Sequence, residues 1–419
     1  MALEPSFELS PAQAYTARYA SLTGRPAGAA LMMTFPPATP AADVSTWWAK
    51  LAQAYDVLRI RFVRSPGGGL QQSFDNEPVP VRVLRLQGRT AAQQAAYAAA
   101  LQRRHATTPC ETPGTPSAQL VVPADGPLLF SAALHRAAMD AWAHELLTQR
   151  AEILWRDATS PLDGAVASYE AHLRRQAIGH NERVGQNLEH WKRRLGYLRG
   201  TRTRPRPPGV ADGSVVIASL RDARREAVRH AASALGCSEA TLCCAVFADI
   251  VAQVIGETEF LLRIVAANRT RRADRGVIGR LASVIHAPVN ANIADTPGAL
   301  ARALNRELLG GFARADFSYE ELATWLGCED RIVDATGCHY QFSYFPEGRA
   351  TPSRHAASQS SYAIVAIRRP VAAHSLVMRV AGSADELEIE FACAHDVHMC
   401  APEDLVHRLQ ESLARLGVS

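Results

Sequence analysis

The chain has 419 residues, of which 47% are hydrophobic and 21% are charged, and its formal net charge is +4. This length and apolar content are enough for a large core divided between two or three units of ordinary domain size. A charge so close to balance does not favour nucleic acid as a partner.

The N-terminus and the apolar stretches indicate neither secretion nor insertion into a membrane. Residues 1–10 (MALEPSFELS) have no basic region and no apolar region of the kind found in secretory signals. The longest apolar-rich stretch, residues 243–255, is interrupted by Asp249 and is too short to span a bilayer. We therefore expect a cytoplasmic protein that does not contact a membrane.

In the first half of the chain, predicted helices and strands alternate. Ser10 and Pro11 form a helix-start signal, with serine as the cap and proline at the first helical position. Hydrophobic periodicity predicts helices within residues 7–24, 41–57, 91–104, 140–157 and 164–177. Alternation and β-branched content predict strands over residues 29–36, 58–63, 80–86, 118–122 and 128–134.

The second half repeats this mixture after a break. Residues 201–209 (TRTRPRPPG) contain three prolines and three arginines, which favours a linker or exposed loop. Helices are predicted over residues 181–199, 221–235, 238–255, 297–309, 317–326 and 402–416. Strands are predicted over residues 213–220, 260–266, 338–345, 374–381 and 386–394, with 282–290 irregular or strand. We therefore expect an α/β (α+β) protein of two-layer sandwiches, divided at residues 1–178 and 179–419.

The eight cysteines show no spacing typical of a disulfide framework, so we expect them to be buried thiols. One cluster has the chemistry of a zinc site, since Cys393, His395, His398 and Cys400 read C-x-H-x-x-H-x-C. However, residues 387–395 (LEIEFACAH) alternate like a strand, whereas ligand sets of this kind usually lie on loops. The sequence therefore favours the absence of a metal.

Residues 128–142 (LLFSAALHRAAMDAW) combine a predicted buried strand, a tight turn and the start of a helix. This arrangement exposes side chains at the end of a strand and supplies backbone N–H groups with no partner inside the helix. Many folds contain it, so the segment indicates a place suited to chemistry without identifying the chemistry.

A set of segments in a fixed order makes a specific resemblance. The segments are residues 10–13 (SPAQ), 55–62 (YDVLRIRF), 135–142 (HRAAMDAW), 169–173 (YEAHL), 188–191 (LEHW), 267–279 (from ANR to IG), 317–322 (FSYEEL) and 340–344 (YQFSY). In this order, over nearly the whole chain, they resemble the condensation domains of nonribosomal peptide synthetases. The resemblance implies two chloramphenicol-acetyltransferase-like lobes in a V-shaped pseudo-dimer with a central tunnel, the first lobe carrying the HHxxxDG-like motif.

The motif departs from the family at its second histidine, which the family assigns to chemistry and which is Arg136 here. Arginine stays protonated, so it cannot act as a general base. Its planar fork can bind a carboxylate or a phosphate, or stabilise an oxyanion. The alternative is a position that has drifted in a domain without catalysis. His144, one helical turn after Asp140, is a further candidate for the missing base.

The resemblance implies roles for other residues. His135 matches the first motif histidine, for which we expect a packing role ahead of a chemical one. Asp140 matches an aspartate that pairs with an arginine in the family, and Arg269 is the candidate partner; a helix cap is the equally natural alternative for Asp140. The candidates for lining the tunnel are Trp142, Ser283, His286, Gln341 and Ser343.

Two functions follow from the resemblance. The first is an acyltransferase that moves a group from the phosphopantetheine arm of a carrier protein to an amine or hydroxyl, with no cofactor of its own. The second is a binding platform like the X-domains of glycopeptide synthetases, which carry HR in place of HH and recruit a tailoring oxidase. Ala141 departs from the HRxxxDD form of that subgroup. We expect a monomer in either case.

Overall fold

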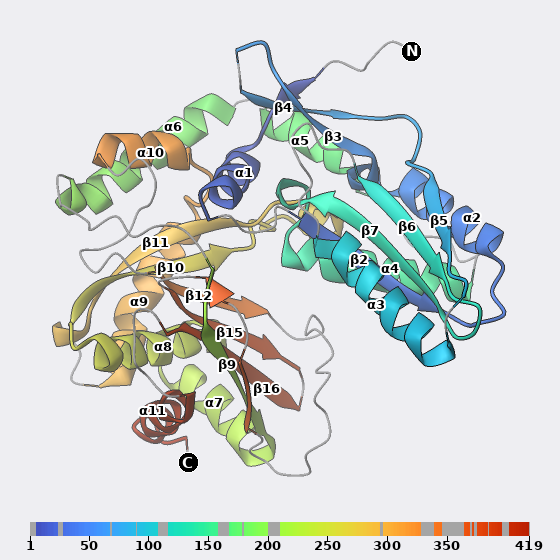
Figure 1. Cartoon of the computed structure of the whole chain (residues 1–419). Coiled ribbons are helices and arrows are strands. Elements are labelled where there is room, and N and C mark those ends of the chain that lie inside the picture. Colours follow the sequence, from blue (N-terminus) through green and yellow to red (C-terminus); the bar gives the residue numbers. More distant parts are fainter. Residues whose placement is uncertain are drawn as a thin grey trace. The chain divides into compact units, whose positions relative to one another are not determined.

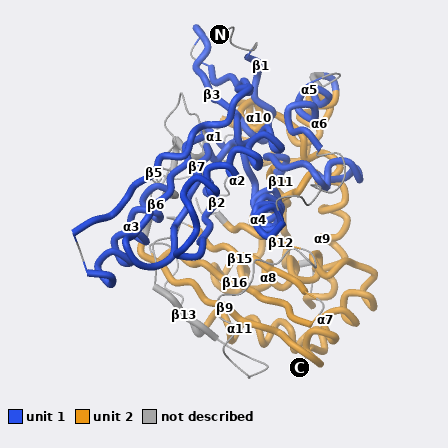
Figure 2. Tube along the Cα trace, turned by 90° about the vertical axis from the view of Figure 1, so that its right-hand side faces the viewer, with its two compact units in different colours: residues 1–21, 25–182, 269–282 blue, residues 22–24, 183–268, 283–419 orange. Residues whose placement is uncertain are grey.

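The chain forms two compact units in the computed structural model (Figure 1, Figure 2). The first comprises residues 1–21, 25–182 and 269–282, and the second comprises 22–24, 183–268 and 283–419. The segment 269–282 therefore belongs to the first unit. The division predicted from the sequence, at residues 1–178 and 179–419, placed this segment in the second unit. The structure describes residues 6–23, 28–67, 69–88, 90–107, 116–157, 167–177, 180–199, 210–293, 296–327, 339–345, 364–368, 371–372, 375–383, 385–395 and 402–418.

A four-stranded sheet with the order β2-β7-β6-β5 forms the centre of the first unit. Its strands are β2 (Gly28–Phe35), β5 (Val81–Arg85), β6 (Ser117–Val122) and β7 (Leu128–His135). The pairs β2–β7 and β6–β7 are antiparallel, and β5–β6 is parallel. Strand β7 lies in the interior of the sheet, and nearly all its residues are buried. It therefore holds its last residue in a fixed position.

Helices cover both faces of this sheet. Helix α3 (Ala91–Thr107) lies against β2, β6 and β7, while α2 (Ala41–Ala54) and α4 (Ala141–Arg156) pack together over the other face. The indole of Trp47 donates a hydrogen bond of 3.0 Å to the carbonyl oxygen of Ala151, which ties α2 to α4. Because both faces are covered, β7 reads as a continuous apolar run.

A second, three-stranded sheet of the first unit has the order β1-β4-β3, with strands Phe7–Glu8, Leu70–Phe74 and Ile60–Arg64. The strand predicted over residues 58–63 begins only at residue 60, because Asp56–Arg59 form a 3₁₀ turn. Asp56 Oδ2 accepts from the backbone N–H of Glu170 at 2.9 Å, which fixes that turn at the start of helix α5 (Tyr169–Ala177). Helix α1 spans Pro11–Thr23.

The second unit contains a seven-stranded sheet with the order β11-β10-β12-β15-β16-β9-β13. The strands are β9 (Gly213–Arg221), β10 (Glu259–Ala266), β11 (Ser283–Asn290), β12 (His339–Phe345), β13 (Ile364–Arg368), β15 (Ser375–Gly382) and β16 (Glu386–Ala394). The short strands β8 (Val210–Ala211) and β14 (Val371–Ala372) form a separate pair. The segment 283–290 is thus a strand throughout.

One face of this sheet is packed with helices α7 (Asp222–Ala234), α8 (Glu239–Ile255), α9 (Pro297–Phe312) and α11 (Pro402–Ala414) (Figure 1). Helices α6 (His180–Leu195) and α10 (Tyr319–Leu326) complete the unit. Ser238 caps α8 through a hydrogen bond from the N–H of Thr241, and Gly256 ends it with a φ of 70°. The prediction for this helix is confirmed.

No single helix in the described ranges has the length and apolar content to cross a membrane, although α7 and α8, which meet at a bend of 97°, reach that threshold as a pair. The mixed α/β architecture predicted from the sequence is confirmed in both units. The predicted linker at 201–209 and the start of the helix predicted over 164–177 lie outside the described residues.

Candidate functional site: the strand–turn–helix motif

The motif lies where β7 ends and α4 begins, as the sequence predicts. His135 is the last residue of β7, and Arg136–Ala138 form a 3₁₀ turn. Asp140 then caps α4, its Oδ1 accepting from the N–H of Ala143 at 2.8 Å. The residues of the motif therefore sit on a rigid junction between an interior strand and a helix.

His135 is buried and occupied by structural contacts. Its Nδ1 accepts a hydrogen bond of 3.2 Å from the N–H of Ala137, and its ring lies 4.7 Å from that of Phe62. Burial, and then the positive charge of Arg280, lower the pKa of His135 to about 4. The imidazole is therefore neutral near pH 7 and shapes the turn.

Arg136 differs from its neighbours because its side chain is exposed while residues 137–140 are buried. Its backbone is fixed by Arg280, whose Nε donates to the carbonyl oxygen of Arg136 at 3.0 Å. Arg280 Nη2 also donates to the carbonyl oxygen of Met139 at 2.9 Å. The turn is thus clamped at both ends by one guanidinium.

Asp140 is at the centre of a buried network. Arg269 Nη1 lies 2.8 Å from Asp140 Oδ2, and the two side chains are 1% and 3% exposed. The N–H groups of Leu281 and Ala282 donate to the same oxygen at 2.9 and 2.8 Å. Burial by itself raises the pKa of Asp140, but the charge and hydrogen bonds of Arg269 outweigh it and lower the pKa. Asp140 thus serves as a cap and as an ion-pair partner together.

A glycine allows the segment 269–282 to pack closely against the first residue of helix α5. A Cβ atom on Gly279 would lie 2.2 Å from Cδ2 of Tyr169, whose side chain is fully buried. The phenol of Tyr169 donates to the carbonyl oxygen of Arg280 at 3.0 Å. Burial raises the pKa of that phenol, so it stays a donor. Only glycine permits this approach.

Two other predicted residues of the first unit have structural contacts. The indole of Trp142 donates to the carbonyl oxygen of Arg275 at 3.2 Å, and the guanidinium of Arg269 lies 5.4 Å from the centre of its ring. His144 Nε2 lies 2.8 Å from the carbonyl oxygen of Ala30, which ties α4 to β2. His144 therefore has a partner that would compete with a role as base.

The remaining candidates lie in the second unit. Gln341 and Ser343 point away from the helices, because the intervening Tyr340 and Phe342 are in the core. His286 lies on the same face of β11. Ser283 donates to the carbonyl oxygen of Ala315 at 2.7 Å and accepts from Asn268 at 2.9 Å.

Two residues that the sequence analysis did not single out are prominent in the structure. Arg280 clamps the motif turn, and Arg263 is a buried cation next to His286 and Gln341 on the second sheet. The sequence contained a signal for Arg263, since it is the one charged residue within residues 260–266 (FLLRIVA). Arg280 follows Gly279 without any distinguishing pattern.

Two of the four side chains of the C-x-H-x-x-H-x-C segment, those of Cys393 and His395, lie in the described part of the chain. Cys393 is buried in the core, and its thiol faces the carbonyl oxygen of Ala394 at 3.7 Å. His395 Nε2 lies 2.8 Å from the hydroxyl of Ser214. His398 and Cys400 lie outside the described residues, and the described part of the chain holds no cluster of metal-binding side chains.

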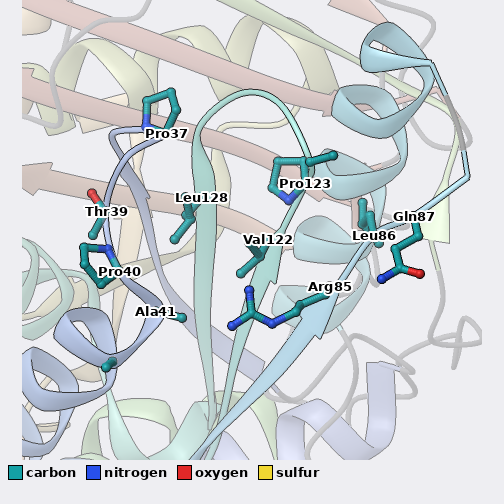
Figure 3. A pocket seen from close by; sticks show the side chains of 12 residues that line it. Pro37, Thr39, Pro40, Ala41, Arg85, Leu86, Gln87, Val122, Pro123 and Leu128 are labelled. Carbon is teal, nitrogen blue, oxygen red and sulfur yellow. The ribbon is translucent and has the colours of Figure 1, made fainter.

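A pocket of 670 Å³ lies at the other end of the first unit's sheet, away from the motif (Figure 3). It is formed where β2 and β5 end and where β6 turns into β7, and Arg85 extends into it. Leu128, at its wall, begins the strand that His135 ends. None of the residues predicted for the site lines this pocket.

Comparison with known proteins places these features in a family context. The sequence model of the family described as the condensation domain matches residues 5–399. No curated protein sequence matches the chain.

Several solved structures share the fold. The starter condensation domain of rhizomide synthetase RzmA, with C8-CoA and Leu-SNAC, has a TM-score of 0.68 at 18% identity, covering 99% of this chain and 94% of that one. The first condensation domain of the calcium-dependent antibiotic synthetase, with a substrate analogue, has a TM-score of 0.67 at 17% identity, covering 100% and 97%. The condensation domain of the Monacolin K polyketide synthase MokA has a TM-score of 0.69 at 15% identity, covering 99% and 97%.

Proposed function

This chain belongs to the condensation domain family, and on that premise we propose that it transfers a carrier-bound acyl or peptidyl group to an amine or hydroxyl acceptor. The donor is a thioester on the phosphopantetheine arm of a carrier protein, within cytoplasmic nonribosomal peptide or hybrid polyketide synthesis. The domain works as a monomer without a cofactor of its own.

The observation that carries this proposal is that the strand–turn–helix of the motif is firmly held in place, while the second motif histidine of the family is replaced by Arg136. The turn is clamped by Arg280, and Asp140 accepts from both its own helix and the segment 269–282. On this scaffold the exposed side chain is Arg136. A position without any function would not require a turn whose backbone is fixed by this many hydrogen bonds.

The chemistry assigned to Arg136 is electrostatic. The acceptor nitrogen or oxygen attacks the thioester carbon, the carbonyl oxygen becomes an oxyanion, and the C–S bond then breaks. The proton of the acceptor ends on the departing thiolate, so the reaction balances without another reactant. A guanidinium close to the oxyanion stabilises it, and holding both reactants in line supplies much of the remaining acceleration.

The binding platform is the alternative, and a specific observation favours it. His135 is buried with Nδ1 already in a hydrogen bond, and His144 Nε2 is placed against a backbone carbonyl. Neither imidazole is arranged as a free general base. A platform that binds a carrier protein or recruits a tailoring oxidase needs no base, whereas a transferase must activate its acceptor by position alone.

Intact-mass spectrometry of carrier proteins separates the two functions. A donor carrier is loaded with acyl groups and offered amine, hydroxyl and carrier-bound acceptors, with the wild type and with Arg136→Ala. Arg156→Ala is the matched control, because Arg156 is an exposed arginine of the same unit whose partner is Glu152, four residues before it.

We expect the donor carrier to lose its acyl mass in the presence of the wild type and of Arg156→Ala, and much more slowly with Arg136→Ala. Absence of turnover with every acceptor, together with measurable binding of a carrier or an oxidase, would instead establish the platform. Equal turnover by Arg136→Ala would remove Arg136 from the chemistry.

A further inference from the structure

The second unit contains a polar pocket at the place where helix α6 meets the end of helix α9. The pocket has a volume of 380 Å³, which lies within the range of small-molecule sites. Its walls come from α6 and from the two residues that follow α9. The lining residues are Gln186, Asn187, His190, Arg193, Ala313 and Arg314. None of them belongs to the candidate site at the motif.

Buried hydrogen bonds hold the walls of this pocket together. The indole of Trp191, which is 2% exposed, donates to the carbonyl oxygen of Arg314 at 2.8 Å. The side-chain amide of Asn187 donates to the carbonyl oxygen of Asp316 at 2.7 Å. The chain that follows α9 is therefore fixed against α6, and the pocket is a constant feature of this unit.

The charge at the wall of the pocket is positive. Arg193 and Arg314 carry guanidinium groups there, and no acidic residue lines the pocket. Within the described part of the chain, Arg193 has no carboxylate partner, and the neighbouring Glu307 is already paired with Arg194 at 2.6 Å. Arg314 Nη1 donates to the carbonyl oxygen of Gly310 at 3.1 Å, which counters the negative end of α9.

His190 is subject to this positive charge. Burial lowers the pKa of His190, and the charges of Arg314 and Arg193 lower it further. Glu307 opposes this shift, with the smallest of the effects. The imidazole is therefore neutral near pH 7, and a neutral imidazole can donate one N–H to an anion.

We propose that this pocket binds a dianionic phosphate group, either as a phosphomonoester or as free phosphate. The inference goes beyond the proposed transfer and does not depend on it. Arg193 and Arg314 donate to the phosphate oxygens, and neutral His190 donates one further hydrogen bond. The two guanidinium groups balance the two negative charges of the ligand.

The chemistry and size of the pocket favour a phosphate group over a carboxylate. The planar fork of a guanidinium matches two oxygens of a phosphate. A phosphomonoester carries nearly two negative charges at neutral pH, because its second pKa is about 6. A carboxylate would leave one of the two guanidinium groups without a counter-charge. The volume of 380 Å³ also leaves room for the small organic group of an ester.

The first test follows His190 and requires no turnover. Histidine-labelled protein is titrated with inorganic phosphate, glycerol phosphate and dimethyl phosphate at constant ionic strength, and the imidazole resonances are measured by NMR. The chain has 14 histidines, and the His190 signal is the one that His190→Gln lacks. A dianion beside the imidazole favours its protonated form. We therefore expect inorganic phosphate and glycerol phosphate to raise the pKa of His190 saturably, and dimethyl phosphate, a monoanion, to leave it unchanged.

Variants then assign the binding to the pocket. Arg193→Gln and Arg314→Gln should each raise the dissociation constant for phosphate about 10- to 100-fold, as loss of a charge-assisted hydrogen bond does. Arg302→Gln is the matched control, since Arg302 is an exposed arginine of α9 that does not line the pocket. It removes the same charge and should leave binding unchanged. Urea unfolding separates lost binding from lost folding, and Arg193→Gln, at an exposed residue, keeps the test valid if Arg314→Gln unfolds.

The outcomes separate the ligands from one another. Tighter binding of glycerol phosphate than of inorganic phosphate would support an ester as the ligand, and the reverse would support the free ion. A response to dimethyl phosphate as strong as that to phosphate would overturn the inference, because the pocket would not select a dianion. Equal losses in Arg193→Gln and Arg302→Gln would overturn it as well, since the effect would then be one of overall charge. No response of His190 to any phosphate would also overturn it, and in each case the transfer assay tests the proposed function separately.

Discussion

Asp140 and Arg269, which are 129 residues apart in the sequence, form an ion pair of 2.8 Å with side chains 3% and 1% exposed. Each partner has further contacts, since Asp140 caps α4 and Arg269 donates to the carbonyl oxygen of Gly279 at 2.9 Å. The pair therefore joins the start of α4 to the segment 269–282. Both charges depend on each other, because neither has water as an alternative partner.

Replacing Asp140 with alanine should be strongly destabilising. Arg269 would remain buried without its counter-charge, and the N–H groups of Leu281 and Ala282 would lose their acceptor. Breaking a buried pair in this way costs about 3–5 kcal/mol. Asp75→Ala is the control, because its partner Arg61 is 36% exposed and such surface pairs contribute about 1 kcal/mol or less. Urea unfolding of both variants measures the contrast, and equal losses would contradict it.

The burial of His135 predicts a dependence of stability on pH. Its pKa is about 4 in the folded protein and about 6.5 in the unfolded chain. The unfolded state therefore binds a proton first, so stability falls as the pH drops below about 6.5 and this loss levels off near pH 4. Between pH 7 and pH 5 the contribution amounts to about 2 kcal/mol.

His135→Asn isolates this effect, since an asparagine oxygen can accept from the Ala137 N–H in place of Nδ1. The free energy of unfolding, measured by urea at pH 7 and pH 5, should fall less for the variant than for the wild type by about 2 kcal/mol. If stability changes with pH in the same way for both proteins, the pKa of His135 does not differ between the folded and the unfolded state.

The elements that could be predicted from the sequence are those with strong local signals. Helix α8 has a serine cap, a glycine end and a continuous apolar core, and its predicted bounds agree with the structure. Strand β4 was not predicted, because Leu70–Phe74 reads LQQSF and its glutamines look like surface residues. The buried side chain of Gln72 is satisfied by Gln13 of helix α1, whose Nε2 donates to Gln72 Oε1 at 2.7 Å. The residues around Gln72 in the sequence do not indicate this contact.

The local structure of the candidate site could be predicted from the motif, whereas the long-range contacts that support it could not. The strand–turn–helix of residues 128–142 was located correctly, and Arg269 was identified as the partner of Asp140 through the family resemblance. The role of Arg280 depends on two carbonyl groups that lie more than 140 residues earlier in the chain. Periodicity reports which residues are buried, but not which distant carbonyl groups they reach.

Gly279→Ala should disrupt the packing of the segment 269–282. The added methyl would overlap the buried ring of Tyr169, with a Cβ–Cδ2 distance of 2.2 Å. Overpacking of this kind typically costs about 1–3 kcal/mol and can cost more. Gly276→Ala, in the same segment, is the control, since its Cβ would meet nothing within 4 Å. Thermal unfolding should separate the two variants, and Tyr169→Ala should recover part of the loss in Gly279→Ala; if it does not, the clash has another origin.

Arg280→Met should lower stability much more than Arg136→Ala does, although both variants should slow transfer. Methionine matches the length of Arg280 but cannot donate to the carbonyl oxygens of Arg136 and Met139, so the turn loses its clamp. Hydrogen bonds to a charged group contribute about 1.5–3 kcal/mol, and we expect a loss of that size in the free energy of unfolding. Arg136 is exposed, and its removal should change stability by about 0.5 kcal/mol or less.

The transfer assay completes this comparison. If Arg136 acts on the oxyanion, Arg136→Ala lowers kcat by about 100-fold, as loss of an oxyanion donor does, at nearly unchanged stability. Arg280→Met should also lower kcat, because the backbone that carries Arg136 is no longer fixed, and Arg280→Lys should restore part of both properties. A variant at position 280 that loses stability but keeps kcat would show that the clamp supports the fold alone, and that Arg136 does not depend on a fixed turn.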